Sequence, residues 1–563
     1  MLALALAPVS LGEITIDGLS SDERANVRHS LSLAKADCDT PAWSLRRMTA
    51  GAPDEVRAAL EPLGYYRATS DIRDTSSKSG CWKKTLTIVP GEPTRYGEAG
   101  VAVTGPGAEE AAFRNVLART AVKPGEVVHH GRYRALKTSL QNTATQLGYF
   151  DARFETAEVV VREDLALADV ALNFATGPRY RIGQVTVESD LIEKSLFDTL
   201  IDVRQDMPYN ASNIAATHRN LQDSGYFAYE NVRADPNEAD GLEVPVVIEA
   251  APAKTRVYTG GLGYATDVGP RFRLNYRNRR INRRGHTLNS QLLASPVQSV
   301  LGAEYRIPAG DDRRDVLSLA ASVEEQDTDT SEFSSVELGV RRTHAQDSGW
   351  LRTLGLDLRR EDFKVGTQDE SSTLLIPSIS WFRSTQAASA RPASGYRLAL
   401  DVRGAGEGLG SDTSFVQLEL TARAIRSLGE RWRVLTRARL GATSRESSDA
   451  LPVSLRFFAG GDNSVRGYGF ETIGPVDEDG IVIGGSMLAT GSLELDYLLN
   501  DRWALAVFAD TGSAFDSGSP DFKTGLGIGV RRLTPVGPLR IDLAAPLDLD
   551  RTVRLHFSIG SDL

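Results

Sequence analysis

The second half of the chain alternates between apolar and polar residues, from about residue 256 to the C-terminus. Alternation at period two is typical of β-strands that have one apolar and one polar face. The run VQLELTARA (416–424) places Val416 and Leu418 on one face and Gln417 and Glu419 on the other. The same design recurs in the runs YRLALDVR (396–403), LGLDLR (354–359), LRIDLA (539–544) and VRLHFSIG (553–560). This half of the chain is therefore expected to be all β.

A soluble β-sandwich would show the same alternation, but two features favour a transmembrane barrel. Arg and Asp recur on the polar face, as in a water-filled lumen, and aromatic residues cluster near strand ends, as at a membrane interface. These aromatic residues are Trp350, Trp381, Phe382, Trp432 and Trp503. At roughly 19 residues per strand and turn, the segment predicts about sixteen antiparallel strands, an even number that closes without an edge. A mean hydropathy of −0.24 is compatible with this, because only alternate residues would face lipid.

The first half of the chain repeats one phrase three times, about 80 residues apart. The phrase occurs as LEPLGYYRA (60–68), TQLGYFDARF (145–154) and LQDSGYFAYENV (221–232). In each copy a helical segment ends at a glycine, which favours the left-handed conformation that stops a helix, and an aromatic pair opens a strand. With one strand before the helices and two after them, each unit reads β-α-α-β-β.

The repeats set the expected domain boundaries. Three small α+β domains are expected at residues 11–94, 95–178 and 179–254, followed by the barrel at 255–563. Residues 1–10 are apolar but lack a basic start, and are expected to be a signal-peptide remnant or a tag. The only two cysteines, Cys38 and Cys81, both lie in the first repeat. An even, low count favours a disulfide in an oxidising compartment; the alternative is two unrelated buried thiols.

Composition and motifs argue against several classes of function. Lys and Arg number 64 against 74 Asp and Glu, a net charge of −10, so a nucleic-acid partner is not expected. The pair His129 and His130 has no Cys or carboxylate at ligand spacing, which argues against a metal site. The glycines of GGLGYATDVG (260–269) lack the strand–turn–helix setting of a dinucleotide loop, and no G-x-S-x-G motif occurs. The chain is therefore expected to be neither an enzyme nor a cofactor protein.

One long connection, from about residue 442 to 485, interrupts the rhythm of short strands and turns. Loops of this length in a compact domain are usually functional or disordered. It contains LRFFAGGDNSVRGYGF (455–470), in which glycines permit tight backbone paths. The second predicted strand after the loop carries FADTG (508–512), whose Asp510 faces inward by parity. An arginine that entered the lumen would need such an acidic partner.

Together these motifs resemble the Omp85 superfamily, and the three repeats resemble its POTRA domains rather than three generic α+β domains. The runs GYATDVGPR (263–271), PDFKTG (520–525) and PVGPLRIDLA (535–544) and the terminus FSIGSDL are similar to the TamA branch of that superfamily. The resemblance implies that the long loop enters the lumen and that its arginine meets the aspartate of the later strand. The implied loop residues are Val465, Arg466, Gly467 and Tyr468, and the implied anchor residues are Phe508, Asp510 and Gly512.

The resemblance also implies a role and a setting. The chain would insert autotransporters and other outer-membrane proteins, in the outer membrane of a Gram-negative bacterium, with its POTRA domains in the periplasm. Its partners would be a TamB-like protein anchored in the inner membrane, unfolded outer-membrane protein clients and outer-membrane lipid. The alternatives are a two-partner-secretion transporter, the main barrel-assembly subunit, which usually has five POTRA domains, and a passive porin. Two-partner-secretion transporters usually have two POTRA domains and a plug helix, which this sequence does not match.

Barrel closure suggests the mechanism. The seam between the first and last strands is the one strand pair that no hairpin turn fixes. Glycine lowers strand stability, so Gly260, Gly261 and Gly263 on the first strand and Gly560 near the last are expected to weaken the seam. A seam that opened sideways would expose a strand edge to an incoming strand.

Overall fold

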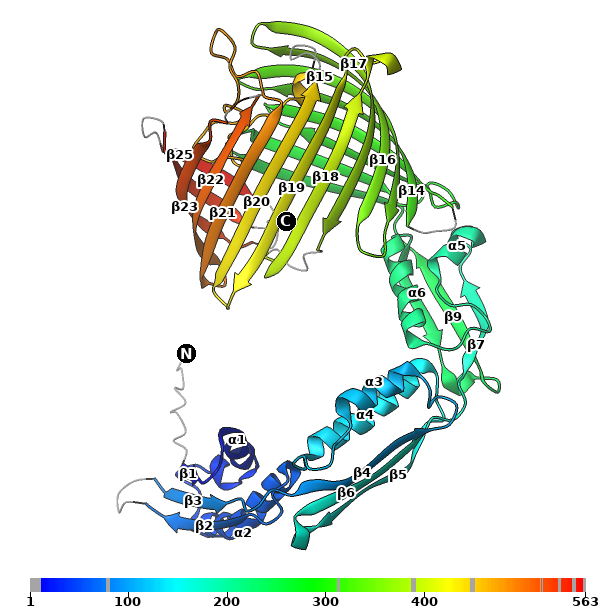
Figure 1. The fold of residues 1–563 in the computed structure, drawn as a ribbon, viewed down its shortest axis with the longest axis vertical. Helices are drawn as coiled ribbons and strands as arrows, with labels where there is room; N and C mark the ends of the chain where they lie inside the picture. The colour runs from blue at the N-terminus through cyan, green and yellow to red at the C-terminus, as the bar shows by residue number, and fades with distance from the viewer. Residues whose placement is uncertain are drawn as a thin grey trace, which may run out of the picture. The chain divides into compact units, whose positions relative to one another are not determined.

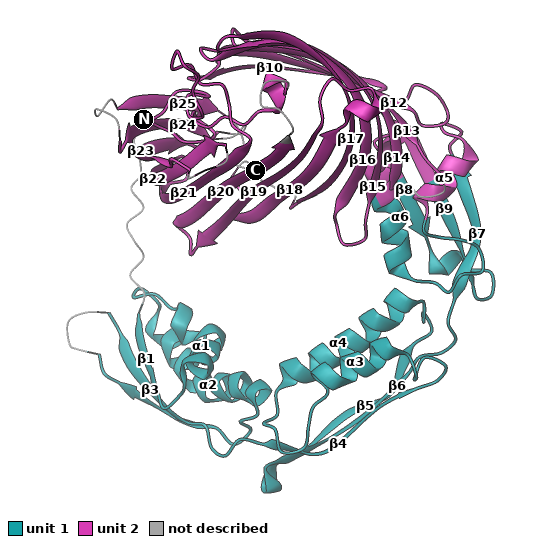
Figure 2. Cartoon of the chain, turned by 45° about the horizontal axis from the view of Figure 1, so that its top comes forward, with its two compact units in different colours: residues 1–188, 202–219, 231–248 teal, residues 189–201, 220–230, 249–563 magenta. Residues whose placement is uncertain are grey.

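The computed structural model describes residues 12–76, 81–310, 314–385, 391–445, 451–516, 518, 520–534, 538–548 and 553–559. The predicted signal remnant at 1–10 and the predicted seam glycine Gly560 lie outside these residues. The chain divides into two compact units (Figure 2). One comprises residues 1–188, 202–219 and 231–248, and the other comprises 189–201, 220–230 and 249–563.

The N-terminal part contains three α+β units in the predicted order β-α-α-β-β, which confirms that part of the predicted fold (Figure 1). Their sheets have the strand orders β1-β3-β2, β4-β6-β5 and β7-β9-β8. The first unit has β1 (Glu13–Asp17), α1 (Ser21–Ser30), α2 (Ala42–Leu60), β2 (Thr69–Asp74) and β3 (Lys83–Val89). The second has β4 (Arg95–Thr104), α3 (Ala111–Thr120), α4 (His130–Leu147), β5 (Arg153–Arg162) and β6 (Leu167–Ala175). The third has β7 (Arg181–Glu188), α5 (Lys194–Leu200), α6 (Ala211–Ser224), β8 (Phe227–Ala234) and β9 (Glu243–Pro252).

The repeated glycine has the same backbone role in each unit. Gly64, Gly148 and Gly225 have φ angles of 94°, 83° and 71°, the left-handed region that a helix end requires and that a side chain disfavours. The chain can then turn back so that the apolar stripe of the preceding helix packs on the sheet. In the second unit, Leu136 of α4 and Phe174 of β6 are fully buried in one apolar core. The three copies of the phrase therefore encode the same helix-to-strand reversal.

A disulfide joins Cys38 and Cys81 in the first unit, with 5.0 Å between their Cα atoms. It connects the segment before α2 to the segment that leads into β3, across 43 residues of sequence. The core of this unit is small, so a covalent closure of this length matters for its stability.

Replacing both cysteines with serine is expected to destabilise the first unit by about 3 to 4 kcal/mol, because the unfolded chain regains the entropy that the closed loop removes. Hydrogen exchange of the β3 amides should then accelerate by roughly a hundredfold or more, while peptides from β5 and β6 serve as the internal control. Labelling of both thiols in denatured, unreduced wild-type protein would show that the bridge is absent.

The C-terminal part is a single sheet of sixteen antiparallel strands in sequence order, which curls around a lumen (Figure 1). The predicted sixteen-stranded barrel is thereby confirmed. The first eight strands are β10 (Arg256–Ala265), β11 (Gly269–Asn278), β12 (Thr287–Ala294), β13 (Gln298–Pro308), β14 (Asp315–Asp327), β15 (Ser331–Ala345), β16 (Leu351–Val365) and β17 (Gln368–Ser384). The last eight are β18 (Ser394–Ala405), β19 (Phe415–Leu428), β20 (Trp432–Arg445), β21 (Met487–Asn500), β22 (Trp503–Phe515), β23 (Lys523–Arg532), β24 (Leu539–Pro546) and β25 (Arg554–Ile559).

The alternation in sequence becomes an outer apolar face and an inner polar face. On β16, Leu354, Leu356 and Leu358 are each 47% exposed, whereas Asp357 between them is 8% exposed. An apolar outer surface of this kind suits a lipid environment. Among the described residues, no helix is both long and apolar enough to cross a membrane.

The long predicted connection lies between β20 and β21 and begins its described part at Leu451. Its apolar side chains pack against the inner face of the barrel wall. Phe457, Val465 and Tyr468 of the loop form one buried cluster with Leu488 of β21 and Ala514 of β22. The loop is therefore folded inside the lumen, and we refer to residues 451–486 as the luminal loop.

Candidate functional site

The path of the luminal loop depends on glycines in the left-handed region. Gly460, Gly461 and Gly467 have φ angles of 103°, 99° and 100°. A residue with a Cβ would be strained at each position. The backbone N–H of Gly467 donates to Nε2 of His556 on β25, at 2.9 Å. These turns place the intervening residue Arg466 against the barrel wall.

Arg466 is buried, with 3% of its surface exposed, and its guanidinium binds Asp510 of β22 through two parallel hydrogen bonds. Nε lies 2.7 Å from Oδ2 and Nη2 lies 3.0 Å from Oδ1. The backbone N–H of Arg466 also donates to Oδ2, at 3.2 Å. Asp510 is fully buried. Bidentate pairing fixes orientation as well as distance, so this contact defines where the loop lies.

Two further carboxylates complete the surroundings of Arg466. Its Nη1 lies 2.8 Å from Glu494 Oε2 of β21 and 3.0 Å from Asp542 Oδ2 of β24. Arg531 of β23 binds the other oxygens of the same two carboxylates. Arg466, Arg531 and the nearby Arg437, 3.9 Å from Asp510, carry three positive charges that balance the three carboxylates. We refer to these six residues as the luminal charge cluster.

The other sequence-predicted residues pack around this cluster. The guanidinium carbon of Arg466 lies 3.4 Å from the centre of the Phe508 ring, a cation–π contact. A Cβ at Gly512 would lie 3.0 Å from Val465, so the glycine leaves room for that fully buried side chain. Tyr468 donates its hydroxyl hydrogen to Asp548, beyond the end of β24. The structure thus brings the predicted loop and anchor residues together.

Sequence reasoning missed Glu494, Arg531 and Asp542. Each occupies an inward-facing position of an alternating strand, so parity alone places all three on the luminal face. Parity does not say which luminal side chains of separate strands reach the same point. Sequence distance does not help either, because Glu494 and Asp542 lie 28 and 76 residues from Arg466. A search for charged residues with inward parity near Asp510 would have proposed them as candidates.

The seam between β10 and β25 is joined at one end only, within the described residues. The N–H of Thr266, just after β10, donates to the carbonyl oxygen of Phe557 at 3.3 Å, and the N–H of Phe557 donates to the Thr266 hydroxyl at 2.7 Å. Arg271 of β11 reaches the carbonyl oxygen of Ile559 at 3.3 Å. Tyr264 and Phe557 form an aromatic contact with 5.9 Å between ring centres. No regular ladder joins β10 to β25 in the part of the chain that the structure describes.

The predicted seam glycines of β10 come before this junction in the sequence, on the part of the strand nearer its start. Gly260 and Gly261 have open space where a side chain would be, and a Cβ at Gly263 would meet Arg271 of the neighbouring strand. None of the three forms a hydrogen bond with the described residues of β25. Within the described residues, β10 and β25 are joined only around Thr266 and Phe557. The three glycines have their described ladder partners on β11.

The sixteen-stranded barrel, its luminal loop and the three preceding α+β units define an outer-membrane barrel protein with a POTRA-type N-terminal part. Residues 269–563 match the Omp85 superfamily domain, and residues 13–90 match the first POTRA domain of TamA. The chain belongs to the Omp85 superfamily.

Several known proteins are similar to this chain. The outer membrane protein assembly factor BamA of Nitratidesulfovibrio vulgaris is 23% identical over 376 residues, 62% of this chain and 47% of that protein. The chloroplastic outer envelope protein 80 of Arabidopsis thaliana is 26% identical over 379 residues, 59% of this chain and 49% of that protein. The chain thus spans about half the length of the curated relatives that it matches.

The fold is also similar to that of a solved structure, BamA from Haemophilus ducreyi lacking POTRA domains 1-3. The TM-score is 0.66 at 16% identity, and the match covers 83% of this chain and 99% of that one. At this identity the similarity concerns the fold alone.

Proposed function

We propose that this chain inserts outer-membrane proteins, autotransporters among them, by opening sideways between β10 and β25. The observation that supports the proposal is the small number of bonds between the described residues of β10 and β25. Neighbouring strands elsewhere in the barrel share long ladders, such as the fifteen paired residues of β15 and β16. The first and last strands share only the few bonds around Thr266 and Phe557 among the described residues.

The energy of opening follows from these bonds. Each hydrogen bond contributes about 0.5 to 1.5 kcal/mol net, so breaking the few bonds between the described residues of the two strands costs a few kcal/mol. The freed backbone groups of β10 then form an edge that an incoming strand can extend by main-chain hydrogen bonds. An edge of this kind is a template on which the strands of an unfolded outer-membrane protein can form by pairing with β10.

The remainder of the proposed setting follows from the family. The three α+β units extend into the periplasm as docking domains, and a TamB-like protein anchored in the inner membrane is the proposed partner. The segment at residues 13–90 supports this assignment, because it matches the first POTRA domain of TamA. Outer-membrane lipid surrounds the apolar outer face, and clients leave the seam directly into it.

A disulfide across the seam tests the proposal. The rings of Tyr264 and Phe557 are in contact across the seam, so the Tyr264→Cys/Phe557→Cys pair is the pair to oxidise, and mass spectrometry first establishes that the disulfide forms. The oxidised pair is expected to insert an unfolded autotransporter barrel into proteoliposomes no faster than liposomes without the protein. Gel mobility of the unheated sample shows that the locked barrel is folded.

The matched control is a second disulfide on the same strand, away from the seam. Leu262 of β10 and Phe272 of β11 face each other in the hairpin register, so Leu262→Cys/Phe272→Cys locks a pair that the proposal keeps closed. This variant and the oxidised single-cysteine variants should insert clients at the wild-type rate. Full activity of the locked Tyr264→Cys/Phe557→Cys protein would rule out lateral opening at this seam.

A further inference from the structure

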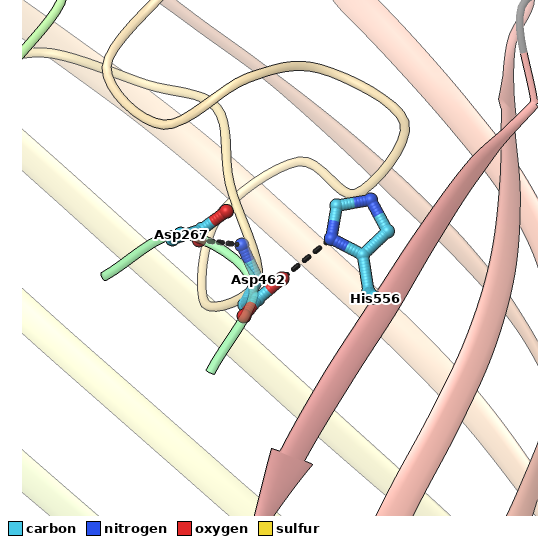
Figure 3. Close-up of side chains that lie close together, drawn as sticks. All are labelled: Asp267, Asp462 and His556. Carbon is cyan, nitrogen blue, oxygen red and sulfur yellow. Dashed lines mark hydrogen bonds and ion pairs between the residues drawn. The ribbon is translucent and has the colours of Figure 1, made fainter. Parts of the chain in front are cut away.

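Three side chains from separate parts of the barrel meet beside the seam (Figure 3). Asp267 lies in the turn between β10 and β11, Asp462 lies on the luminal loop, and His556 lies on β25. The N–H of Asp462 donates to Asp267 Oδ2, and His556 Nδ1 lies 2.5 Å from Asp462 Oδ1. One potential ligand atom from each residue lies within 4.8 Å of the other two. The loop therefore contacts the turn that follows β10 and the last strand, β25.

The charges of the two carboxylates are only partly compensated, by His556 and Arg554 near Asp267. Asp462 has a side chain that is only 8% exposed, and its Oδ2 has no hydrogen-bond partner. A buried carboxylate oxygen without a partner is costly. Among the described residues, the only side chain that pairs with Asp462 is His556, and no lysine or arginine forms an ion pair with Asp267.

His556 is neutral in this arrangement, and neither of its ring nitrogens is free to bind a metal ion. Its Nε2 accepts a hydrogen bond from the backbone N–H of Gly467, at 2.9 Å, so the lone pair of Nε2 is engaged. The hydrogen of the neutral ring is then on Nδ1 and is donated to Asp462 Oδ1. In this arrangement His556 positions the Asp462 carboxylate and leaves its Oδ2 available.

We propose that a hard divalent cation, Mg²⁺ or Ca²⁺, binds between the carboxylates of Asp267 and Asp462. Oxygen ligands are those that both ions prefer, and Mg²⁺ commonly uses one or two carboxylates and keeps several waters. Bound there, the cation joins the luminal loop to the first hairpin, while His556 joins the same Asp462 to the last strand. The site therefore stabilises the closed seam from the luminal side.

Calorimetric titration of the full chain in detergent, after removal of divalent ions with a chelator, tests the site. Mg²⁺ and Ca²⁺ are expected to bind with one saturable site per chain, and Asp267→Asn and Asp462→Asn should each weaken binding at least tenfold. Asp329→Asn is the matched control, because Asp329 is an exposed aspartate in the turn between β14 and β15. Gel mobility of unheated samples establishes that each barrel is folded.

Two results would overturn the proposal. The first is absence of saturable Mg²⁺ and Ca²⁺ binding to the folded wild-type chain, or equal affinity in all three variants. The second is Zn²⁺ binding more than tenfold tighter than Ca²⁺ that disappears in His556→Gln, because this would show that an imidazole nitrogen is a ligand. Binding is measured directly, so these outcomes do not depend on whether the chain inserts clients.

Discussion

The Arg466→Met variant is expected to release the luminal loop from the barrel wall and to destabilise its docked state by about 3 to 5 kcal/mol. Methionine keeps much of the side-chain volume but removes the guanidinium. Asp510, which is fully buried, would lose both hydrogen bonds of the bidentate pair, and Glu494 and Asp542 would each lose one. The buried cluster would then hold three carboxylates against two arginines, and release of the loop would let water reach them.

Hydrogen exchange of loop peptides in detergent or lipid discs measures this effect. Amides of Phe457, Ala459 and Ile473, which are bonded within the loop, should lose most of their protection. Arg433→Met is the control, since Arg433 is equally buried and pairs with Asp496 on the neighbouring wall strand. It should weaken the barrel without freeing the loop. Wild-type protection in Arg466→Met would mean that apolar packing alone holds the loop.

A charge reversal refines the same test. Arg466→Glu should lower the protection of the luminal loop more than Arg466→Met, because it adds a fourth carboxylate to the cluster. Combining it with Asp510→Arg is expected to restore part of the loop protection, limited by the loss of bidentate geometry. Absence of any restoration would indicate that the position of the arginine matters as much as the balance of charge.

The Gly525→Ala variant is expected to have the second-largest effect on the loop. A Cβ at Gly525 of β23 would overlap the backbone carbonyl oxygen of Arg466, and a main-chain atom cannot move aside as a flexible side chain can. Overpacking of this kind costs about 1 to 3 kcal/mol or more. The loop should shift inward and part of the contact with Asp510 should be lost.

Thermal loss of the folded gel form and hydrogen exchange of the luminal loop measure the Gly525→Ala effect. Gly491→Ala on β21 is the matched control, because a Cβ there meets nothing within 4 Å. It also changes a strand glycine to alanine, so any difference between the two variants reports the contact with the loop. Equal behaviour of both variants would show that the loop tolerates displacement at Arg466.

Much of the architecture could be predicted from local pattern. The period-two runs predict strands because each strand face meets one environment along its whole length, and the repeated helix–glycine–aromatic phrase predicts three like domains. The pairing of Arg466 with Asp510 could be proposed because inward parity and the long loop restrict which acidic residues can meet an arginine of the loop. The contacts of Glu494 and Asp542 could not, because they depend on which luminal side chains of the consecutive strands β21 to β24 reach the same point on the loop.

The seam was less predictable for a different reason. A hairpin fixes the register of its two strands through its turn, whereas the first and last strands have no shared turn. Glycine content indicated a weak first strand, but the structure places the cross-seam bonds at Thr266 and Phe557, beyond the glycine stretch. Likewise Asp267, Asp462 and His556 come from distant segments, so their spacing in the sequence does not predict that they lie close together in the structure.

The small number of bonds between the described residues of β10 and β25 also has a consequence for how copies of this chain behave toward one another. A strand edge without a ladder partner pairs with a strand of a second copy as readily as with any other strand, and such edge-to-edge association leads to aggregation. The bonds of Thr266 with Phe557 and the contact of Asp462 with both border segments keep one end of that edge covered. Loosening these contacts would therefore favour self-association of the barrels in the membrane, so the strength of this junction limits how readily two copies pair edge to edge.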